Sequence, residues 1–159
     1  MVSIPAFVLA NNGKDRQYRF TFSEVEIARW LYENGPPGSL LIEGSRSYPS
    51  QFMNYENFAY LPISEESLET QQELLADPAG VLSRWLEQSE NGGFVILTQS
   101  QMASVYDTGI MPLGAFDTII ASLLASPRFT LLKAAPEAKV FGLHPRSDMF
   151  DNWSNTDLR

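Results

Sequence analysis

The sequence contains no cysteine and only one histidine among its 159 residues. The lack of cysteine excludes disulfides, a thiol nucleophile and thiolate metal sites, and one histidine leaves too few ligands for zinc. A cysteine-free chain is compatible with either redox compartment and suits an exported bacterial segment. We therefore expect that the chain binds neither a metal ion nor another cofactor.

Basic residues are also few, because 11 Lys and Arg compare with 19 Asp and Glu, for a formal net charge of −8. Nucleic-acid binding depends on clustered Lys and Arg, and no basic run occurs in this chain. The charge balance thus argues against nucleic acid as a partner. Long hydrophobic runs are missing too, since the longest candidate, at 119–125, is far shorter than the roughly 20 apolar residues of a membrane span.

The length suits one domain that can bury roughly 70% of the surface of the unfolded chain. We expect this single α/β domain at 23–143, after an N-terminal connector or clip at 1–22 and before a flexible tail at 144–159. The apolar patch at 4–10 lacks the basic segment of a signal peptide. Two interpretations of it stay open: a strand packed on the domain, or a connector just outside a membrane helix.

The first helix is predicted from its start signals. Ser23 and Glu26 have the spacing of a capping box, in which each side chain accepts a hydrogen bond from the other's backbone N–H. Phe22 and Ile27 have the spacing of a hydrophobic staple around the same start. The pattern predicts a helix that begins at Ser23 and ends at the sequence NGPPG.

Two short, continuously apolar runs, SLLIE and FVILT, predict adjacent central strands, and NFAYLPI predicts a third strand. RFTLLKAAPEAKVFGL predicts a hairpin. Helices are predicted between the strands, at SEESLETQQELLA, after the Asp77-Pro78 cap, at SQMASVYD and at LGAFDTIIASLLAS. This order predicts a three-layer α/β sandwich with a mostly parallel, Rossmann-like sheet and a C-terminal antiparallel hairpin.

The candidate site lies where the central strands end, since open α/β sheets bind ligands beyond the carboxyl ends of their strands. SLLIE ends in Glu43, and a loop with Arg46 and Tyr48 follows it. Gln101 follows FVILT. We predict that Glu43, Arg46, Tyr48 and Gln101 bind a ligand. The alternative is that Glu43 and Arg46 form an ion pair with each other and that the tyrosines pack.

No complete catalytic set is found in the sequence. The nucleotide-binding patterns G-x-G-x-x-G and G-x-x-x-x-G-K-[ST] do not occur. Ser45, Asp107 and His144 have the chain order of α/β-hydrolase residues, but the nucleophile elbow G-x-S-x-G is missing. The glutamates at 65, 66, 69 and 73 are expected to form a solvated helical face. We therefore predict no catalytic residue and no catalytic activity of the isolated domain.

Three stretches together resemble a known family: SEVEIARWLYENGPPGSLLIEGSRSYPSQFMNYENFAY, then GGFVILTQSQMASV, then GIMPLGAFDTIIASLLASPRFTLLKAAPEAKVFGL. They are similar to the soluble C-terminal extracytoplasmic domain of bacterial polytopic membrane glycosyltransferase-like proteins, over about residues 20–143. The resemblance implies a larger chain that uses a lipid-linked sugar, with its membrane-embedded part as the partner of this domain. In that family the catalytic acid lies between early membrane helices, so no catalytic residue is carried over.

The leading prediction is a non-catalytic accessory or recognition domain on the extracytoplasmic face of a bacterial membrane. Its loop at 44–55 would be the recognition surface, where Arg46 meets a phosphate or carboxylate and Tyr48 and Tyr55 meet a sugar. A free-standing small α/β enzyme and a protein-interaction module are the alternatives, and a cytoplasmic location is the alternative to the extracytoplasmic one.

Overall fold

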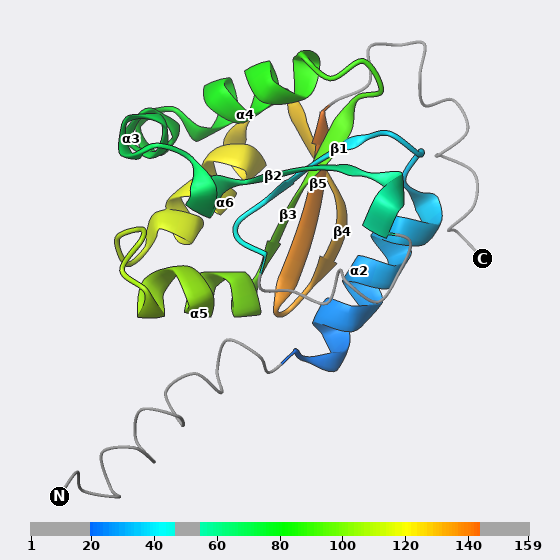
Figure 1. The fold of residues 1–159 in the computed structure, drawn as a ribbon, viewed down its shortest axis with the longest axis horizontal. Helices are drawn as coiled ribbons and strands as arrows, with labels where there is room; N and C mark the ends of the chain where they lie inside the picture. The colour runs from blue at the N-terminus through cyan, green and yellow to red at the C-terminus, as the bar shows by residue number, and fades with distance from the viewer. Residues whose placement is uncertain (1–19, 47–54, 144–159) are drawn as a thin grey trace, which may run out of the picture.

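The computed structural model describes residues 20–46 and 55–143 (Figure 1). Its sheet has five strands in the order β2-β1-β3-β5-β4. In chain order, the strands are β1 (Leu40–Glu43), β2 (Ala59–Pro62), β3 (Gly93–Thr98), β4 (Phe129–Ala135) and β5 (Ala138–Leu143). β1 pairs in parallel with β2 and β3, whereas β5 is antiparallel to β3 and β4. The predicted adjacent central strands and the predicted C-terminal hairpin are therefore confirmed.

The helices also occur where the sequence predicts them. They are α2 (Phe22–Asn34), α3 (Leu68–Ala76), α4 (Pro78–Glu87), α5 (Gln99–Asp107) and α6 (Ala115–Ala125), with short 3₁₀ turns η1 (Tyr55–Asn57) and η2 (Ile63–Glu65). α4 begins at Pro78 as predicted, because the Asp77 side chain accepts a hydrogen bond from the Gly80 N–H at 3.0 Å. The chain is thus a mixed α/β protein.

The predicted N-cap of α2 was wrong by two residues. The N-cap is Thr21, and the capping box joins Thr21 to Glu24 rather than Ser23 to Glu26. The sequence TFSEVE contains both patterns, and the first one forms because the Glu24 carboxylate gains a further donor, the Ser100 N–H. Ser23 instead donates a hydrogen bond to the carboxylate of Glu137. A distant contact therefore decides between two equivalent local signals.

Successive strand residues contribute to two separate apolar clusters, as expected when side chains alternate between the faces of a sheet. Leu41 and Phe94 belong to a cluster with Ile27 and Leu31 of α2. Ile42 and Val95 belong to the other cluster, to which helices α3, α4, α5 and α6 contribute. Both central strands are buried from either side, which explains why their sequences are apolar without interruption.

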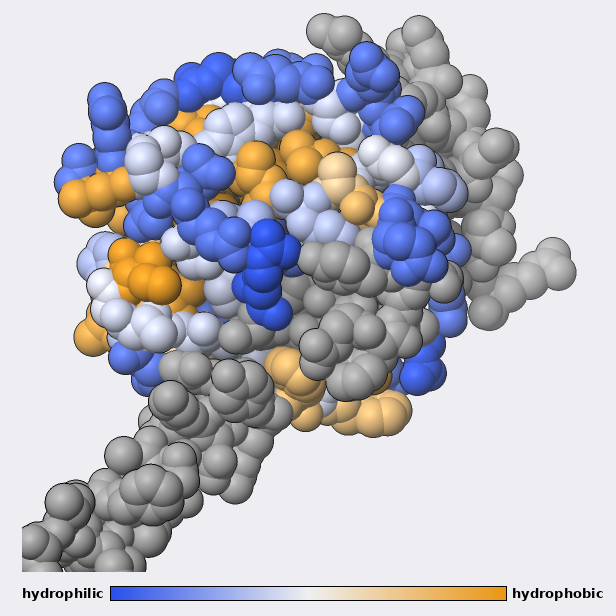
Figure 2. All heavy atoms as spheres, in the orientation of Figure 1, coloured by the Kyte–Doolittle hydropathy of each residue, from blue (hydrophilic) through white to orange (hydrophobic). Residues whose placement is uncertain are grey.

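The surface carries both polar and apolar side chains, and Phe22, Leu68 and Leu113 are exposed apolar residues. On the face drawn in Figure 2, hydrophilic residues divide the hydrophobic surface into separate small areas. No helix among the described residues is both long and apolar enough to cross a membrane. The flexible tail predicted at 144–159 and most of the N-terminal connector predicted at 1–22 lie outside the described residues.

Candidate functional site

The carboxyl ends of β1 and β3 form a topological switch point, the position at which open α/β sheets bind ligands. Both strands run in the same direction. The chain leaves β1 toward β2 on one side of the sheet, and leaves β3 toward the β4–β5 hairpin on the other. β3 continues directly into α5 at this end of the sheet (Figure 1). The structure therefore brings the residues that follow β1 and those that follow β3 together.

Glu43 is the last residue of β1, and its side chain is only 1% exposed. One carboxylate oxygen, Oε1, lies 3.8 Å from Nη1 of Arg46, whose side chain is 51% exposed. The predicted alternative, an ion pair between these two residues, is thus present. The half-exposed Arg46 side chain therefore lies between the buried Glu43 carboxylate and the solvent, at the predicted end of the strands.

The Arg46 guanidinium also binds Glu65 of η2 through two hydrogen bonds, from Nε to Oε1 at 2.6 Å and from Nη2 to Oε2 at 3.2 Å. This bidentate geometry is the strong form of an Arg–carboxylate contact. The hydrogen bond from Arg46 is the main cause that holds the pKa of Glu65 below its ordinary value; burial acts in the opposite direction, and the positive charge of Arg46 lowers the pKa further. A phosphate or carboxylate ligand would have to displace Glu65 to reach the same face of Arg46.

Gln101 lies in the first turn of α5 and is fully buried. Its side-chain oxygen accepts a hydrogen bond from the Thr98 N–H at 2.9 Å, which completes the capping box of α5. Its amide nitrogen donates to the carbonyl of Ser45 at 3.0 Å. Gln101 therefore holds the end of β3 and the loop after β1 in place, and its contacts are those of a positioning residue.

Glu24 of α2 reaches the same edge and is also fully buried. Its Oε1 accepts a hydrogen bond from the Ser100 N–H at 2.7 Å, and its Oε2 accepts one from the Thr21 N–H at 2.8 Å. Unpaired N–H groups at a helix N-terminus form a ready-made anion site. At α5, the carboxylate of Glu24 occupies that place, so the protein's own side chain lies where a bound anion would lie.

Gly44 makes the close approach between the loop and the helices possible. A Cβ at this position would lie 2.3 Å from Cζ of Phe116 and 3.3 Å from the side-chain oxygen of Gln101. The Gly44 carbonyl accepts a hydrogen bond from the Ser64 N–H at 3.1 Å, next to Glu65. Gly44 and Ser45, directly after β1, are therefore held by hydrogen bonds from both η2 and α5.

Of the remaining candidate residues, Ser45 and Asp107 are not brought together. Ser45 is buried beside the first turn of α5, whereas Asp107 ends that helix at its opposite terminus. Tyr48 and His144 lie outside the described residues. In the ranges 20–46 and 55–143, no group of three or more His, Asp or Glu side chains has a geometry that could hold a metal ion.

The sequence analysis missed two residues at this edge. Thr21 and Glu24 have capping-box spacing, so the sequence does contain a signal for Glu24. The overlapping Ser23–Glu26 pattern has the same spacing and predicts a different N-cap. Glu65 was assigned to a solvated acidic face, and no local pattern relates it to Arg46, 19 residues earlier. Only the parallel pairing of β1 with β2 brings these two residues together.

No protein-family model, curated protein or solved structure matches this chain. The contacts at the carboxyl ends of β1 and β3 are therefore the structural basis for a proposed function.

Proposed function

We propose that the chain is a non-catalytic recognition domain of a bacterial membrane glycosyltransferase-like protein, positioned on the extracytoplasmic face. Its partners would be the membrane-embedded part of the same protein and a lipid-linked sugar. We also propose that this mixed α/β fold is, more specifically, a three-layer, Rossmann-like sandwich. It rests on the resemblance of residues 20–143 to that family and on the chemistry at the end of β1.

The main support for the proposal is the difference in burial and hydrogen bonding among the polar groups at the ends of β1 and β3. Glu24 and Gln101 are buried and hydrogen-bonded to backbone groups at the end of β3 and in the loop after β1. Groups that are fully buried and used in this way stabilise the fold and do not face a substrate at the surface. Arg46 and Glu65 are exposed at this edge and form a pair suited to recognition rather than to bond breaking.

The Arg46–Glu65 pair can meet a sugar without losing its own geometry. Carboxylate oxygens accept hydrogen bonds from hydroxyl groups, and Glu65, which binds Arg46 through Nε and Nη2, is exposed. A sugar phosphate could exchange with Glu65 on Arg46. We therefore include Glu43, Arg46 and Tyr48 in the proposed site and assign Gln101 to its support.

The test is a chemical-shift titration with short glycans and phosphorylated lipid head groups, on wild type, Arg46→Ala and Arg84→Ala. Arg84 is a matched control, because it also pairs with a glutamate, Glu73, and both pairs are about half exposed. We expect Arg46→Ala to weaken binding about 10-fold or more, as the loss of a charged hydrogen bond predicts. Equal binding by both variants would refute this site, and shifts confined to α3 would place any binding elsewhere.

A further inference from the structure

We propose that the start of α2 is a conformational switch with two positions. In the first position, which the structure contains, the N-cap is Thr21. In the second position, a minor state, the helix begins two residues later and the N-cap is Ser23. The switch goes beyond the proposed function, because it involves none of the residues at the end of β1.

The sequence FTFSEVEI contains the same helix-start pattern twice, offset by two residues. Each copy has a hydroxyl residue at the N-cap and a glutamate three residues later, which is the spacing of a capping box. Each copy also has a phenylalanine before the cap and a branched apolar residue at the fourth position of the helix, which is the spacing of a hydrophobic staple. The first copy has Phe20 and Val25 around Thr21, and the second has Phe22 and Ile27 around Ser23. The local sequence therefore supports both starts.

The contact with α5 favours the first position. Glu24 there accepts hydrogen bonds from the N–H of Thr21 at 2.8 Å and from the N–H of Ser100 at 2.7 Å. Ser23 then lies inside the helix, and its hydroxyl donates a hydrogen bond to the carboxylate of Glu137. The turn that contains Glu137 and the start of α5 lie beside the start of α2, at one end of the sheet (Figure 1). The first position is therefore the major state.

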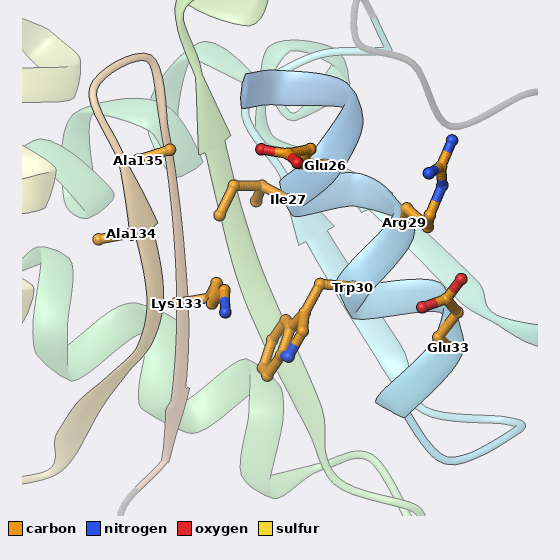
Figure 3. A pocket seen from close by; sticks show the side chains of 8 residues that line it. All are labelled: Glu26, Ile27, Arg29, Trp30, Glu33, Lys133, Ala134 and Ala135. Carbon is orange, nitrogen blue, oxygen red and sulfur yellow. The ribbon is translucent and has the colours of Figure 1, made fainter. Parts of the chain in front are cut away.

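The second position is accessible because it keeps the packing of α2. The buried apolar residues of the helix begin at Ile27, which points toward the sheet (Figure 3), so both positions retain them. Phe22 is 78% exposed in the first position, and in the second it becomes the residue that packs on Ile27 as a staple. Glu26 is exposed and close to the start of α2 (Figure 3), so its carboxylate can reach back to the N–H of Ser23 when Ser23 is the cap. The second position thus loses long-range contacts but gains a complete capping box and an apolar partner for an exposed ring.

The switch couples the chain ahead of α2 to the turn between β4 and β5. Phe22 and Ser23 leave the helix in the second position, and each then spans up to about 3.3 Å instead of about 1.5 Å, which adds roughly 4 Å of reach to the preceding chain. Ser23 also releases Glu137, whose carbonyl accepts a hydrogen bond from the Gln99 N–H of α5 at 2.8 Å. A displacement of the residues before Thr21 would therefore loosen the contact of α2 with this turn. That the membrane-embedded part supplies the displacement rests on the proposed function, whereas the switch itself does not.

Hydrogen exchange of the whole chain, followed by NMR, tests the switch at the amide of Val25. Its N–H donates to the carbonyl of Thr21 at 3.2 Å, and the second position breaks this bond. Thr21→Ala should speed the exchange about 3-fold or more, because it weakens the first cap and leaves the second intact. Adding Glu26→Ala should slow the exchange again by at least about 2-fold, because it weakens the second capping box. Adding Glu26→Gln is the matched control and should keep the Thr21→Ala rate, since glutamine also completes a capping box.

Simple fraying of the first turn gives a different result. It would also speed exchange at Val25 in Thr21→Ala, but Glu26→Ala and Glu26→Gln would then have the same effect. That result, or an unchanged Val25 rate in Thr21→Ala, overturns the inference. Equal loss of protection at Glu26 and Val25 overturns it too, because the Ser23 hydroxyl accepts the Glu26 N–H in the second position. No ligand is used and no residue of the proposed site is changed, so a negative result leaves the proposed function standing.

Discussion

The ends of β1 and β3 lie side by side at one edge of the sheet, but their polar groups are used in different ways. At the end of β3, Glu24 and Gln101 are fully buried and hydrogen-bonded to backbone groups. At the end of β1, Arg46 and Glu65 bind each other while both remain about half exposed. Buried groups of the first kind contribute much to stability, whereas exposed ion pairs contribute little. The comparison indicates that the end of β3 supports the fold and that the Arg46–Glu65 pair at the end of β1 contributes less to it, which is why we propose the end of β1 for recognition.

The largest effect is expected for Glu24→Ala. The substitution removes a buried carboxylate and leaves the N–H groups of Thr21 and Ser100 without an acceptor. A lost hydrogen bond to a charged group and an unsatisfied buried donor each have a substantial cost, so we expect a loss of about 2–4 kcal/mol in the free energy of unfolding. Chemical denaturation measures it. Glu33→Ala, at an exposed position of the same helix, should change stability by no more than about 0.5 kcal/mol. If the two variants were equally stable, Glu24 would not hold the end of β3.

Gln101→Leu should destabilise the protein by about 1–3 kcal/mol, because the Thr98 N–H and the Ser45 carbonyl lose their partner. The substitution keeps a similar volume, so packing changes little. Gln99→Leu, at an exposed position two residues earlier in α5, is the control and should be close to wild type. Hydrogen exchange at the amide of Thr98 should increase only in Gln101→Leu, and an unchanged rate there would argue against the capping role.

Arg84→Ala should change the free energy of unfolding by about 0–1 kcal/mol, because Arg84 belongs to an exposed ion pair. Arg46→Ala should cost about 1–2 kcal/mol, because it also removes the positive charge 3.8 Å from the buried Glu43 carboxylate. Thermal or chemical denaturation measures the stability of the two variants. If their stabilities are similar, weaker ligand binding by Arg46→Ala is a binding defect and not a folding defect. A loss of several kcal/mol in Arg46→Ala alone would mean that the end of β1 is also part of the structural framework.

The smallest effect concerns pH. The folded-state pKa of Glu65 is lowered from its ordinary value of 4.5, mainly by the hydrogen bond from Arg46. Its stabilising contribution is therefore complete above the unfolded-state pKa and is lost as the pH falls through the lower folded-state pKa. The stability difference between wild type and Glu65→Gln should be constant above about pH 5 and should shrink on acidification. Unfolding curves at several pH values measure it, and a difference that grows toward low pH would contradict the assignment.

Much of the fold could be predicted from local patterns, whereas the contacts of the site could not. The uninterrupted apolar residues of β1 and β3 predict central strands, and Asp77 followed by Pro78 predicts where α4 begins. The start of α2 was ambiguous, because Thr21 and Ser23 both have a glutamate three residues later, and only the contact with α5 favours Thr21.

The contacts of the candidate site were harder to predict from the sequence than the start of α2. Its position followed from the general rule for strand ends in α/β sheets. The exposure of each residue did not, because Gln101 and Glu43 have the same polar character in the sequence as exposed residues do. The pairing of Arg46 with Glu65 depends on where β2 aligns beside β1, and no spacing in the sequence encodes that alignment.

The most direct measurement is a residue-resolved titration of the wild-type chain with short glycans and phosphorylated lipid head groups. If the end of β1 recognises the ligand and the end of β3 only supports the fold, the backbone amides of Gly44, Ser45 and Arg46 should shift with added ligand. The amide of Ser100, which is hydrogen-bonded to buried Glu24, should not shift. Shifts at Ser100 without shifts at Arg46 would contradict this division, because the ligand would then have displaced the Glu24 carboxylate from the N-terminus of α5.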